Sequence, residues 1–320
     1  MRFVTFIDSK NQECAGLHTG PFQAGMIVDL SAALARPVSV LSIIENWAEL
    51  QGELRAIERS ANEGKLPSSQ FLPEKNLKLV SPIPRPLSMR DGYAFRQHVE
   101  AARRGRGLPM IPEFDHFPVF YFTNHLAVIG PGDLSVQKLA RAKLDFELEV
   151  AIVVGKGGKN ISAQEADSHI FGYMIMNDWS ARQLQMEEMK LNLGPAKGKD
   201  FATSLGPYLV TRDELASHAE TSPSGEKHNL RMQCWVNGKR VSDGNVKDMT
   251  WTFGQILERV SYGVALYPGE VIGSGTVGTG CFLELNGSKT TDAQWLEPGD
   301  VVVLEVDGLG RLENVILAAD

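Results

Sequence analysis

The sequence predicts a mainly β protein that also contains helices, an α+β fold in two parts. Short segments rich in β-branched and aromatic residues recur along the 320 residues and are separated by turns that contain Gly and Pro. Helical patterns are few and do not alternate regularly with the strands, which disfavours a Rossmann fold and a TIM barrel. The segment Ser81-Pro-Ile-Pro-Arg-Pro86 is stiff and extended. We therefore expect a small N-terminal β domain with one helix at 1–82 and a larger domain at 83–320.

The N-terminal part contains three expected strands and one helix. Residues 2–7, 26–30 and 77–80 have strand patterns bounded by turn residues. Ser42 and Glu45 have the spacing of a capping box, which predicts a helix start there. A stripe of apolar residues at helical spacing and a terminating glycine support the helix: Trp47, Leu50, Leu54, Ile57 and Gly64. We identify no chemical motif in this part.

The larger part contains most of the expected strands. The strand candidates are 143–154, 171–177, 206–211, 229–236, 269–273, 281–286 and 300–306. The helix candidates are 163–168, 180–190 and 251–260.

Composition excludes several classes of protein. The chain is 43% hydrophobic, carries a formal net charge of −7 and has no broad basic face, so a nucleic-acid partner is not expected. No apolar run approaches the roughly 20 residues that a membrane span requires. The three cysteines, Cys14, Cys234 and Cys281, form no CxxC pattern, which indicates a reducing compartment. We expect a cytoplasmic protein that binds no membrane.

The stretch Lys143-Leu-Asp-Phe-Glu-Leu-Glu-Val-Ala-Ile-Val-Val154 places acidic residues at alternate positions. Side chains of a strand alternate between its faces, so Asp145, Glu147 and Glu149 share one face. Glutamates at i and i+2 lie about 7 Å apart along a strand, and their long side chains can converge on one cation. The alternative is a solvated acidic face, but the apolar continuation indicates a buried strand, where carboxylates need a cation or strong donors.

A second strand ends in a polar turn at Asp178, followed by a helix. Ser180 and Gln183 have capping-box spacing, which supports a helix start beside Asp178. Arg182 and Gln185, three residues apart, share one helix face. Read without context, Asp178 is equally a cap or turn residue and Arg182 a surface ion-pair partner.

Six motifs in order resemble those of the fumarylacetoacetate hydrolase family. They are Asp91-Gly-Tyr93-Ala-Phe-Arg-Gln-His98, Glu147-Leu-Glu149, Asn177-Asp178-Trp-Ser-Ala-Arg182-Gln-Leu-Gln185, Gly198-Lys199-Asp-Phe-Ala-Thr203, Gly273-Ser-Gly-Thr276-Val-Gly278 and Leu283-Glu284-Leu285. The resemblance runs from about residue 77 to the C-terminus. It implies a small N-terminal β domain followed by a large mixed β-sandwich or roll, often dimeric, so we expect a homodimer.

The resemblance also implies a set of site residues. Asp91, Glu147, Glu149 and Asp178 would bind one divalent cation, Mg²⁺ or Ca²⁺ with Mn²⁺ as an alternative, and an all-oxygen set suits such hard cations. His98 matches the general base and Glu284 the acid that orients it. Other matches complete the site: Arg182, Gln185 and Lys199 as donors to oxyanion and leaving group, Tyr93, Tyr121 and Thr276 as substrate contacts, and Thr203 beside the pocket.

This set suits the hydrolysis of a carbon–carbon bond in a β-diketo acid. A neutral imidazole can take a proton from water, and a carboxylate orients the ring and stabilises the imidazolium. A divalent cation can hold both substrate oxygens. The resemblance favours 4-fumarylacetoacetate, cleaved to fumarate and acetoacetate in tyrosine and related aromatic catabolism. The family's substrate-binding arginine has three candidates in a loop of different length, Arg103, Arg104 and Arg106, and the sequence does not choose among them.

Other readings remain open. An acylpyruvate hydrolase, a 2-oxoacid decarboxylase or an isomerase would use the same carboxylates. A non-catalytic protein that binds Ca²⁺ and a small acid would not need His98 or Lys199. The GxGxxG pattern at Gly273–Gly278 is not expected to bind a dinucleotide, because a strand is expected to follow it. There is no phosphate-binding Gly-Lys-Ser/Thr and no GxSxG nucleophile elbow.

Overall fold

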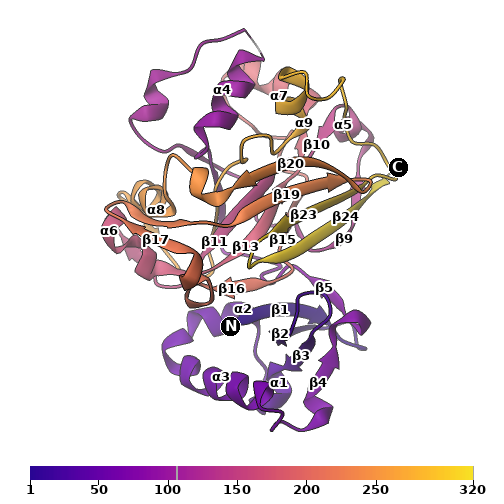
Figure 1. Ribbon diagram of the computed structural model, residues 1–320, viewed down its shortest axis with the longest axis vertical. Helices are drawn as coiled ribbons and strands as arrows, with labels where there is room; N and C mark the ends of the chain where they lie inside the picture. The colour runs from indigo at the N-terminus through magenta and orange to yellow at the C-terminus, as the bar shows by residue number, and fades with distance from the viewer. Residues whose placement is uncertain (106, 320) are drawn as a thin grey trace.

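The computed structural model describes residues 1–105 and 107–319, and its main feature is a 13-stranded sheet (Figure 1). Ten strands form the hydrogen-bonded path and three pair beside it. The path runs β4 (Phe71–Pro73), β3 (Met26–Asp29), β2 (Glu13–Thr19), β1 (Arg2–Ile7), β16 (Leu209–Thr211), β13 (Ile170–Asp178), β11 (Leu148–Val154), β22 (Val271–Gly273), β6 (Met89–Gly92) and β7 (Phe120–Phe122). Beside it, β5 (Lys78–Val80) pairs with β1, β15 (Thr203–Leu205) with β13, and β8 (Val128–Ile129) with β15.

A second sheet of five strands packs against one face of β11 and β13 (Figure 1). Its order is β20 (Lys239–Asn245), β19 (Arg231–Val236), β23 (Val301–Val306), β24 (Gly310–Ala318) and β9 (Gly132–Val136). The core between the sheets contains Leu148, Val150 and Ile152 of β11 with Cys234 and Leu304 of the second sheet. Ala151 and Val153 point to the opposite face and enter a second core. The strand is thus buried on both sides, as its sequence predicts.

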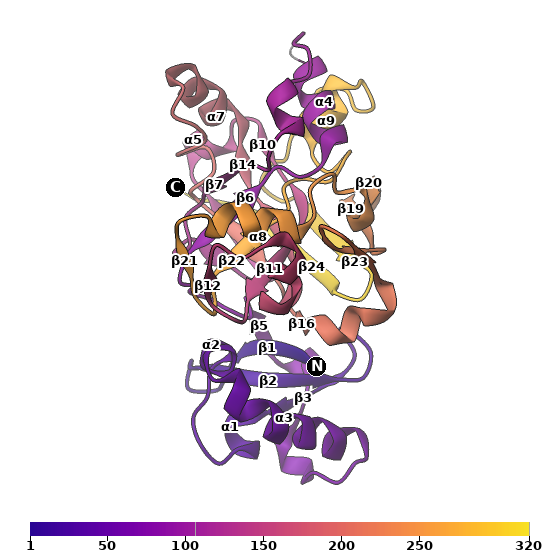
Figure 2. The ribbon, with the colours of Figure 1, turned by 90° about the vertical axis from the view of Figure 1, so that its left-hand side faces the viewer.

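The N-terminal strands and helices form the end of the molecule that is drawn in indigo and purple (Figures 1 and 2). The helices are α1 (Leu30–Ala33), α2 (Val40–Glu45) and α3 (Trp47–Asn62). Strand β1 pairs with β16 at Phe3↔Leu209, so this part continues the large sheet. A domain division at residue 82 stays a prediction.

The start of the N-terminal helix was predicted at the wrong serine. Ser39, not Ser42, is the N-cap: its hydroxyl accepts from Ser42 N at 3.0 Å, and Ser42 Oγ accepts from Ser39 N at 2.8 Å. The helical pattern is then interrupted at Asn46, and the predicted apolar stripe lies on α3, with Leu54 and Ile57 buried. Gly64 follows that helix with φ +65°, a conformation that favours glycine.

The remaining helices cover the ends and sides of the two sheets. They are α4 (Arg96–Arg104), α5 (Lys138–Arg141), α6 (Ala163–Ala166), α7 (Arg182–Glu188), α8 (Phe253–Ser261) and α9 (Phe282–Gly287). Three short strand pairs are β10 (Leu144–Asp145) with β14 (Ser180–Ala181), β12 (Gly158–Lys159) with β21 (Ala265–Leu266), and β17 (Ala219–Ser222) with β18 (Gly225–His228). Short 3₁₀ turns are Ser68–Gln70, Glu74–Asn76, Pro112–Asp115, Asp167–His169, Met189–Leu191, Arg212–His218 and Val246–Asp248. No helix among the described residues is long and apolar enough to cross a membrane.

Two predicted elements differ from the structure. Residues 282–287 form helix α9, not a strand, because the Asp145 carboxylate accepts from Phe282 N at 2.7 Å and Leu283 N at 3.0 Å and so caps the helix. The predicted strand 143–154 is interrupted at 146–147 between β10 and β11. The expectation that a strand follows Gly273–Gly278 was therefore wrong, and it gives no argument against a dinucleotide site there. The motif still opens no helix, since 274–281 is irregular and turn structure in this part of the chain.

Candidate active site

Four carboxylates gather at the end of the large sheet. Asp91 is on β6, Glu149 on β11 and Asp178 at the end of β13, while Glu147 lies just before β11. All four are buried, and their ligand atoms lie within 4.8 Å of one another. Strand pairing produces this convergence, because β22 pairs with both β6 and β11, and β11 pairs with β13. We call this group the carboxylate cluster.

Glycine at position 273 gives the cluster room. It lies opposite Asp91 on β22, and a Cβ there would stand 2.4 Å from Asp91 Oδ1 and 2.8 Å from Met176 Sδ. Such a contact is far inside van der Waals distance, so a larger residue would displace the carboxylate.

Polar side chains of other elements bind part of the cluster. Lys199 Nζ donates to Asp178 Oδ2 at 2.7 Å and to Glu147 Oε2. The Tyr121 hydroxyl donates to Asp178 Oδ2, and Thr276 Oγ1 donates to Glu149 Oε1 at 3.3 Å. Two buried oxygens of the cluster, Glu149 Oε2 and Asp178 Oδ1, have no hydrogen-bond partner among the residues that the structure describes.

The charge balance of the cluster fits a divalent cation. Burial, together with the neighbouring carboxylates, raises the pKa of Asp91 to about 7 and that of Glu149 well above its usual range. Burial alone would also raise the pKa of Glu147, but Lys199 and Arg182 outweigh it and lower the value to about 2. One lysine and one arginine therefore leave the cluster under-compensated. The unpartnered oxygens and the all-oxygen donor set match a hard cation such as Mg²⁺, Ca²⁺ or Mn²⁺.

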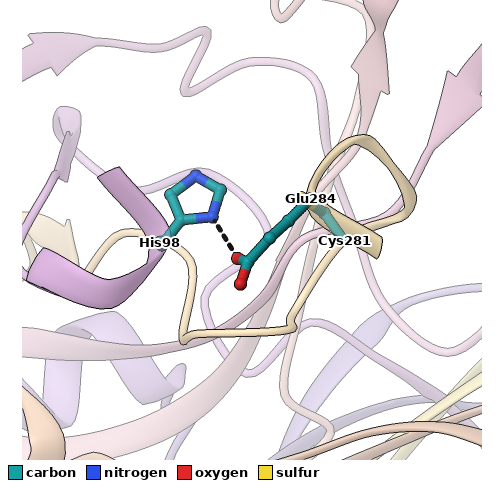
Figure 3. A group of neighbouring side chains, drawn as sticks. All are labelled: His98, Cys281 and Glu284. Atoms are coloured by element: carbon teal, nitrogen blue, oxygen red, sulfur yellow. Dashed lines mark hydrogen bonds and ion pairs between the residues drawn. The ribbon is translucent and has the colours of Figure 1, made fainter. Parts of the chain in front are cut away.

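A buried histidine–glutamate pair forms another part of the site (Figure 3). His98 of α4 donates from Nδ1 to Glu284 Oε2 of α9 at 2.9 Å. The other oxygen of Glu284 accepts from Thr279 N at 2.9 Å, so the carboxylate is fixed at both ends. The two helices lie side by side at the end of the molecule opposite the N-terminal strands (Figure 2). The edge of the Tyr93 ring packs against the His98 ring, with centroids 5.7 Å apart.

Arg182 connects the cluster to helix α9 through Asp145. Its Nε donates to Asp145 Oδ2 at 2.8 Å, its Nη2 to Glu147 Oε1 at 2.8 Å and its Nη1 to Gln185 Oε1 at 3.1 Å. Asp145 is therefore an anchor for Arg182 and for the helix that carries Glu284. Sequence reasoning missed this role, because alternation placed Asp145 on the face of Glu147 and Glu149. Ser180 was likewise wrongly predicted to cap α7: its hydroxyl donates to Asp178 O, and the helix begins at Arg182.

A pocket of about 260 Å³ opens above the cluster and the pair. Most of the residues selected from the sequence line it: Asp91, Tyr93, His98, Tyr121, Glu147, Arg182, Gln185, Lys199 and Thr276. Sequence reasoning did not select its apolar wall: Ala102, Val119, Phe120, Met186, Met189, Pro195 and Leu283. Apart from Leu283, which stands in the motif around Glu284, no short motif marks these apolar residues, because each contributes surface and not chemistry.

Some selected residues lie elsewhere. Thr203 is buried opposite Asp178 in the strand pairing and does not line the pocket in the described chain. Arg103 donates to Pro109 O, and neither it nor the exposed Arg104 lines the pocket as described. Arg106 lies outside the described residues.

Comparison with known proteins places this geometry in a family. The sequence model described as "Fumarylacetoacetate (FAA) hydrolase C-terminal" matches residues 88–317. A fumarylacetoacetase of Oryza sativa subsp. japonica is 32% identical over 84% of this chain and 76% of its own length. The mitochondrial oxaloacetate tautomerase FAHD2B of Bos taurus is 30% identical over 99% of this chain and 92% of its own.

The fold is shared with solved structures. Maleylpyruvate hydrolase from Sphingobium sp. SYK-6, in complex with manganese(II) ion and pyruvate, superposes with a TM-score of 0.71 over 100% of both chains at 20% identity. The relatives thus include hydrolases and tautomerases on one mainly β scaffold, and the family model covers all of the selected residues. The chain belongs to the fumarylacetoacetate hydrolase family.

Proposed function

We propose that this protein hydrolyses a carbon–carbon bond in a β-diketo acid with the help of one divalent cation. The observation that carries the proposal is the buried His98–Glu284 pair, whose histidine lines the same pocket as Asp91 and Glu147 of the carboxylate cluster. When bound by Asp91, Glu147, Glu149 and Asp178, a divalent cation supplies a Lewis acid that holds substrate oxygens and stabilises enolate charge.

His98 and Glu284 activate water in this proposal. A carboxylate can only accept, so Nδ1 of His98 carries the proton of their hydrogen bond and Nε2 is free to accept one from water. The resulting hydroxide adds to a substrate carbonyl carbon, and Glu284 stabilises the imidazolium. The bond from that carbon to the neighbouring methylene then breaks, giving a carboxylic acid and an enolate.

Lys199 and Arg182 supply the positive charge that the enolate requires. Burial alone would lower the pKa of Lys199, but Asp178 and Glu147 raise it above its ordinary value, so the ammonium keeps its charge at neutral pH. Arg182 is fixed by Asp145, Glu147 and Gln185. Such preorganised charges stabilise a transition state without reorganisation. Protonation of the enolate carbon by the His98 imidazolium returns the histidine to its neutral form and balances the reaction.

Fumarylacetoacetate, which would give fumarate and acetoacetate, is the proposed substrate. Its ultraviolet absorbance should fall quickly with the protein, stop after chelation and resume when Mg²⁺ or Ca²⁺ is added. No loss with any cation would sink this substrate, and acylpyruvates would be tested next.

Tautomerisation of an oxaloacetate-like 2-oxo acid is the second candidate, because a 30% identical relative that matches almost the whole chain is an oxaloacetate tautomerase. Decarboxylation is a related alternative, and all three reactions require a stabilised enolate. A tautomerase or decarboxylase releases no second acid by hydrolysis. Analysis of products by chromatography separates the three reactions, and inactivity toward every substrate would favour a non-catalytic protein that binds a small acid.

A homodimer without nucleic-acid partners is proposed as the working state of the protein. It rests on family resemblance and on the acidic net charge of −7. Sedimentation equilibrium at several concentrations tests it, and a monomer at all concentrations would contradict it.

A further inference from the structure

A second group of metal-ligating side chains shares His98 with the proposed catalytic pair. His98, Cys281 and Glu284 each offer one ligand atom, and these atoms lie within 4.8 Å of one another. All three residues are buried. Cys281 immediately precedes α9, which carries Glu284 in its first turn, so both come from one rigid element beside the His98 ring (Figure 3). We call this group the His–Cys–Glu trio.

The donors of the trio differ in kind from those of the carboxylate cluster. One nitrogen, one sulfur and one carboxylate oxygen are ligands that Zn²⁺ accepts, with bonds of about 2.0–2.3 Å in tetrahedral geometry. Tetrahedral ligands at that distance lie about 3.5 Å apart, and the ligand atoms of the trio lie within 4.8 Å of one another, so no pair must close by more than about 1.3 Å. Rotation of the His98 or Glu284 side chain can provide this. Hard cations such as Mg²⁺ instead prefer the all-oxygen cluster.

The Cys281 thiol is expected to be unreactive when no cation is bound. Burial, with the Asp145 carboxylate nearby, raises the pKa of Cys281 well above its usual value. The sulfur is therefore a neutral thiol in the metal-free trio. A bound Zn²⁺ removes the thiol proton outright, and the proton leaves to solvent.

We propose that the His–Cys–Glu trio is a binding site for Zn²⁺ or a similarly soft divalent cation, separate from the carboxylate cluster, and that its occupation inhibits the enzyme. The inhibitory half of this proposal rests on the proposed role of His98 as a base. The binding half does not.

Inhibition follows from the two nitrogens of one imidazole. In the free enzyme Nδ1 carries the ring proton toward Glu284, and Nε2 is free to accept a proton from water. A cation on the Nδ1 side takes that lone pair and leaves the single ring proton on Nε2. The nitrogen that should accept a proton then already carries one, and Glu284 no longer orients the ring. Turnover falls while substrate can still reach the carboxylate cluster, so kcat should decrease more than KM increases.

Cobalt spectroscopy tests binding without any substrate. Co²⁺ is added to the full-length protein whose carboxylate cluster is saturated with Mg²⁺, and the thiolate-to-cobalt charge-transfer band and tetrahedral ligand-field bands are recorded. We expect both in the wild type and in Cys234→Ser, since Cys234 is an equally buried thiol outside the trio. We expect neither in Cys281→Ser. A thiolate band that persists in Cys281→Ser, or none in the wild type, overturns the site.

Zinc inhibition tests the second half. With Mg²⁺ saturating, the zinc concentration for half-inhibition should rise by about 100-fold or more in Cys281→Ser, because even the outer partners of metal ligands change affinity by about 10- to 100-fold. Equal inhibition of wild type and Cys281→Ser would overturn the inhibitory role. Cys281→Ala is measured in parallel, with thermal unfolding, in case serine does not fold in this buried position. If no substrate is turned over, the proposed function fails while the cobalt spectrum still decides the site.

Discussion

Two buried histidines in this chain donate a ring N–H to a buried glutamate: His18 to Glu74 at 3.1 Å and His98 to Glu284 at 2.9 Å. Their surroundings differ. Glu74 also accepts from the Tyr208 hydroxyl and from Gly25 N, and the His18 ring stacks on Phe22 with centroids 5.8 Å apart.

The His18 pair therefore joins the N-terminal strands to the segment that carries Tyr208, whereas His98 lines a pocket together with Asp91 and Glu147 of the carboxylate cluster. A short bond between histidine and carboxylate is thus no sign of catalysis in itself. What distinguishes the catalytic candidate is an accessible second nitrogen with charged groups across a pocket.

Replacing each histidine by alanine should give the largest difference between the two pairs. His98→Ala should lower kcat by about 10²- to 10⁴-fold, the usual contribution of a general base. His18→Ala should keep kcat and lose about 3 kcal/mol of unfolding free energy, because it removes a hydrogen-bond donor from the buried Glu74 carboxyl. Steady-state kinetics and denaturant unfolding measure both. Similar kcat losses in the two variants would remove the distinction.

Removal of the metal should affect the carboxylate cluster and catalysis at the His98–Glu284 pair, and should leave the His18–Glu74 pair unchanged. Chelation should abolish activity, and Mg²⁺ at 100 times its Kd should add about 2.7 kcal/mol to stability. Glu149→Gln should weaken this stabilisation, because it removes the charge next to an unpartnered oxygen of the cluster. Glu74→Gln is the matched control: it makes the same substitution in the His18–Glu74 pair, far from the proposed cation ligands, and should respond to Mg²⁺ like wild type. Calorimetric melting with and without Mg²⁺ shows the result, and an equal response of Glu149→Gln would contradict the cluster as the cation site.

Gly273→Ala should cause a smaller loss confined to the cluster. The added methyl group would meet Asp91 Oδ1 at 2.4 Å and displace that carboxylate. We expect metal affinity to fall about tenfold or more, at the lower end of the range for disturbed ligand environments. Gly52→Ala, where the new methyl group meets nothing within 4 Å, should leave metal affinity unchanged. Isothermal titration with Mn²⁺ compares them, and unchanged affinity in both would mean that Asp91 is not a ligand.

The smallest expected effect is the change of unfolding free energy with pH that the Glu74 carboxyl causes. Burial raises the pKa of this carboxyl, but the bonds from His18 and Tyr208 outweigh burial and lower it below 4.5. A lowered pKa stabilises the fold above pH 4.5, and this contribution disappears as pH falls through the lowered value. The stability gap between wild type and Glu74→Gln should therefore be constant from neutral pH to about 5 and narrow in more acid solution. Unfolding free energies measured across this range test it, and a gap that widens in acid would contradict the sign.

The sequence predicted the parts of the fold that depend on local pattern. The continuous apolar run at the end of 148–154 predicted a strand buried on both faces, and helical spacing from Trp47 to Ile57 predicted α3. Several strands were missed, among them β2 and β24. Strand β2 consists largely of small and polar residues, and in β24 the polar residue Asn314 occupies a buried position and interrupts the apolar face. Both strands are held by neighbouring strands. Helix α9 was read as a strand, because a segment as short as Phe282-Leu-Glu-Leu285 does not reveal a helical or a strand period.

The site shows the same limit. Ordered motifs selected four carboxylates, and the structure brings all four together. Nothing local indicated that Asp145 would turn from its neighbours to bind Arg182 and the start of α9. That contact depends on residues 37 and 137 positions away. The apolar wall of the pocket likewise combines residues that are far apart in the sequence, from Ala102 of α4 to Leu283 of α9.

The proposed cation ligands and the proposed water-activating pair belong to different layers of the molecule. Asp91, Glu149 and Asp178 sit on paired strands of the large sheet, whereas His98 and Glu284 sit on two helices that rest above it. Mutations in the helices can therefore change which bond is broken, or abolish hydrolysis, without dismantling the strands that hold the cation. A scaffold divided in this way can evolve from one enolate chemistry to another in small steps, each intermediate keeping its metal. The hydrolases and tautomerases among the relatives of this chain are the range of outcomes that such a division permits.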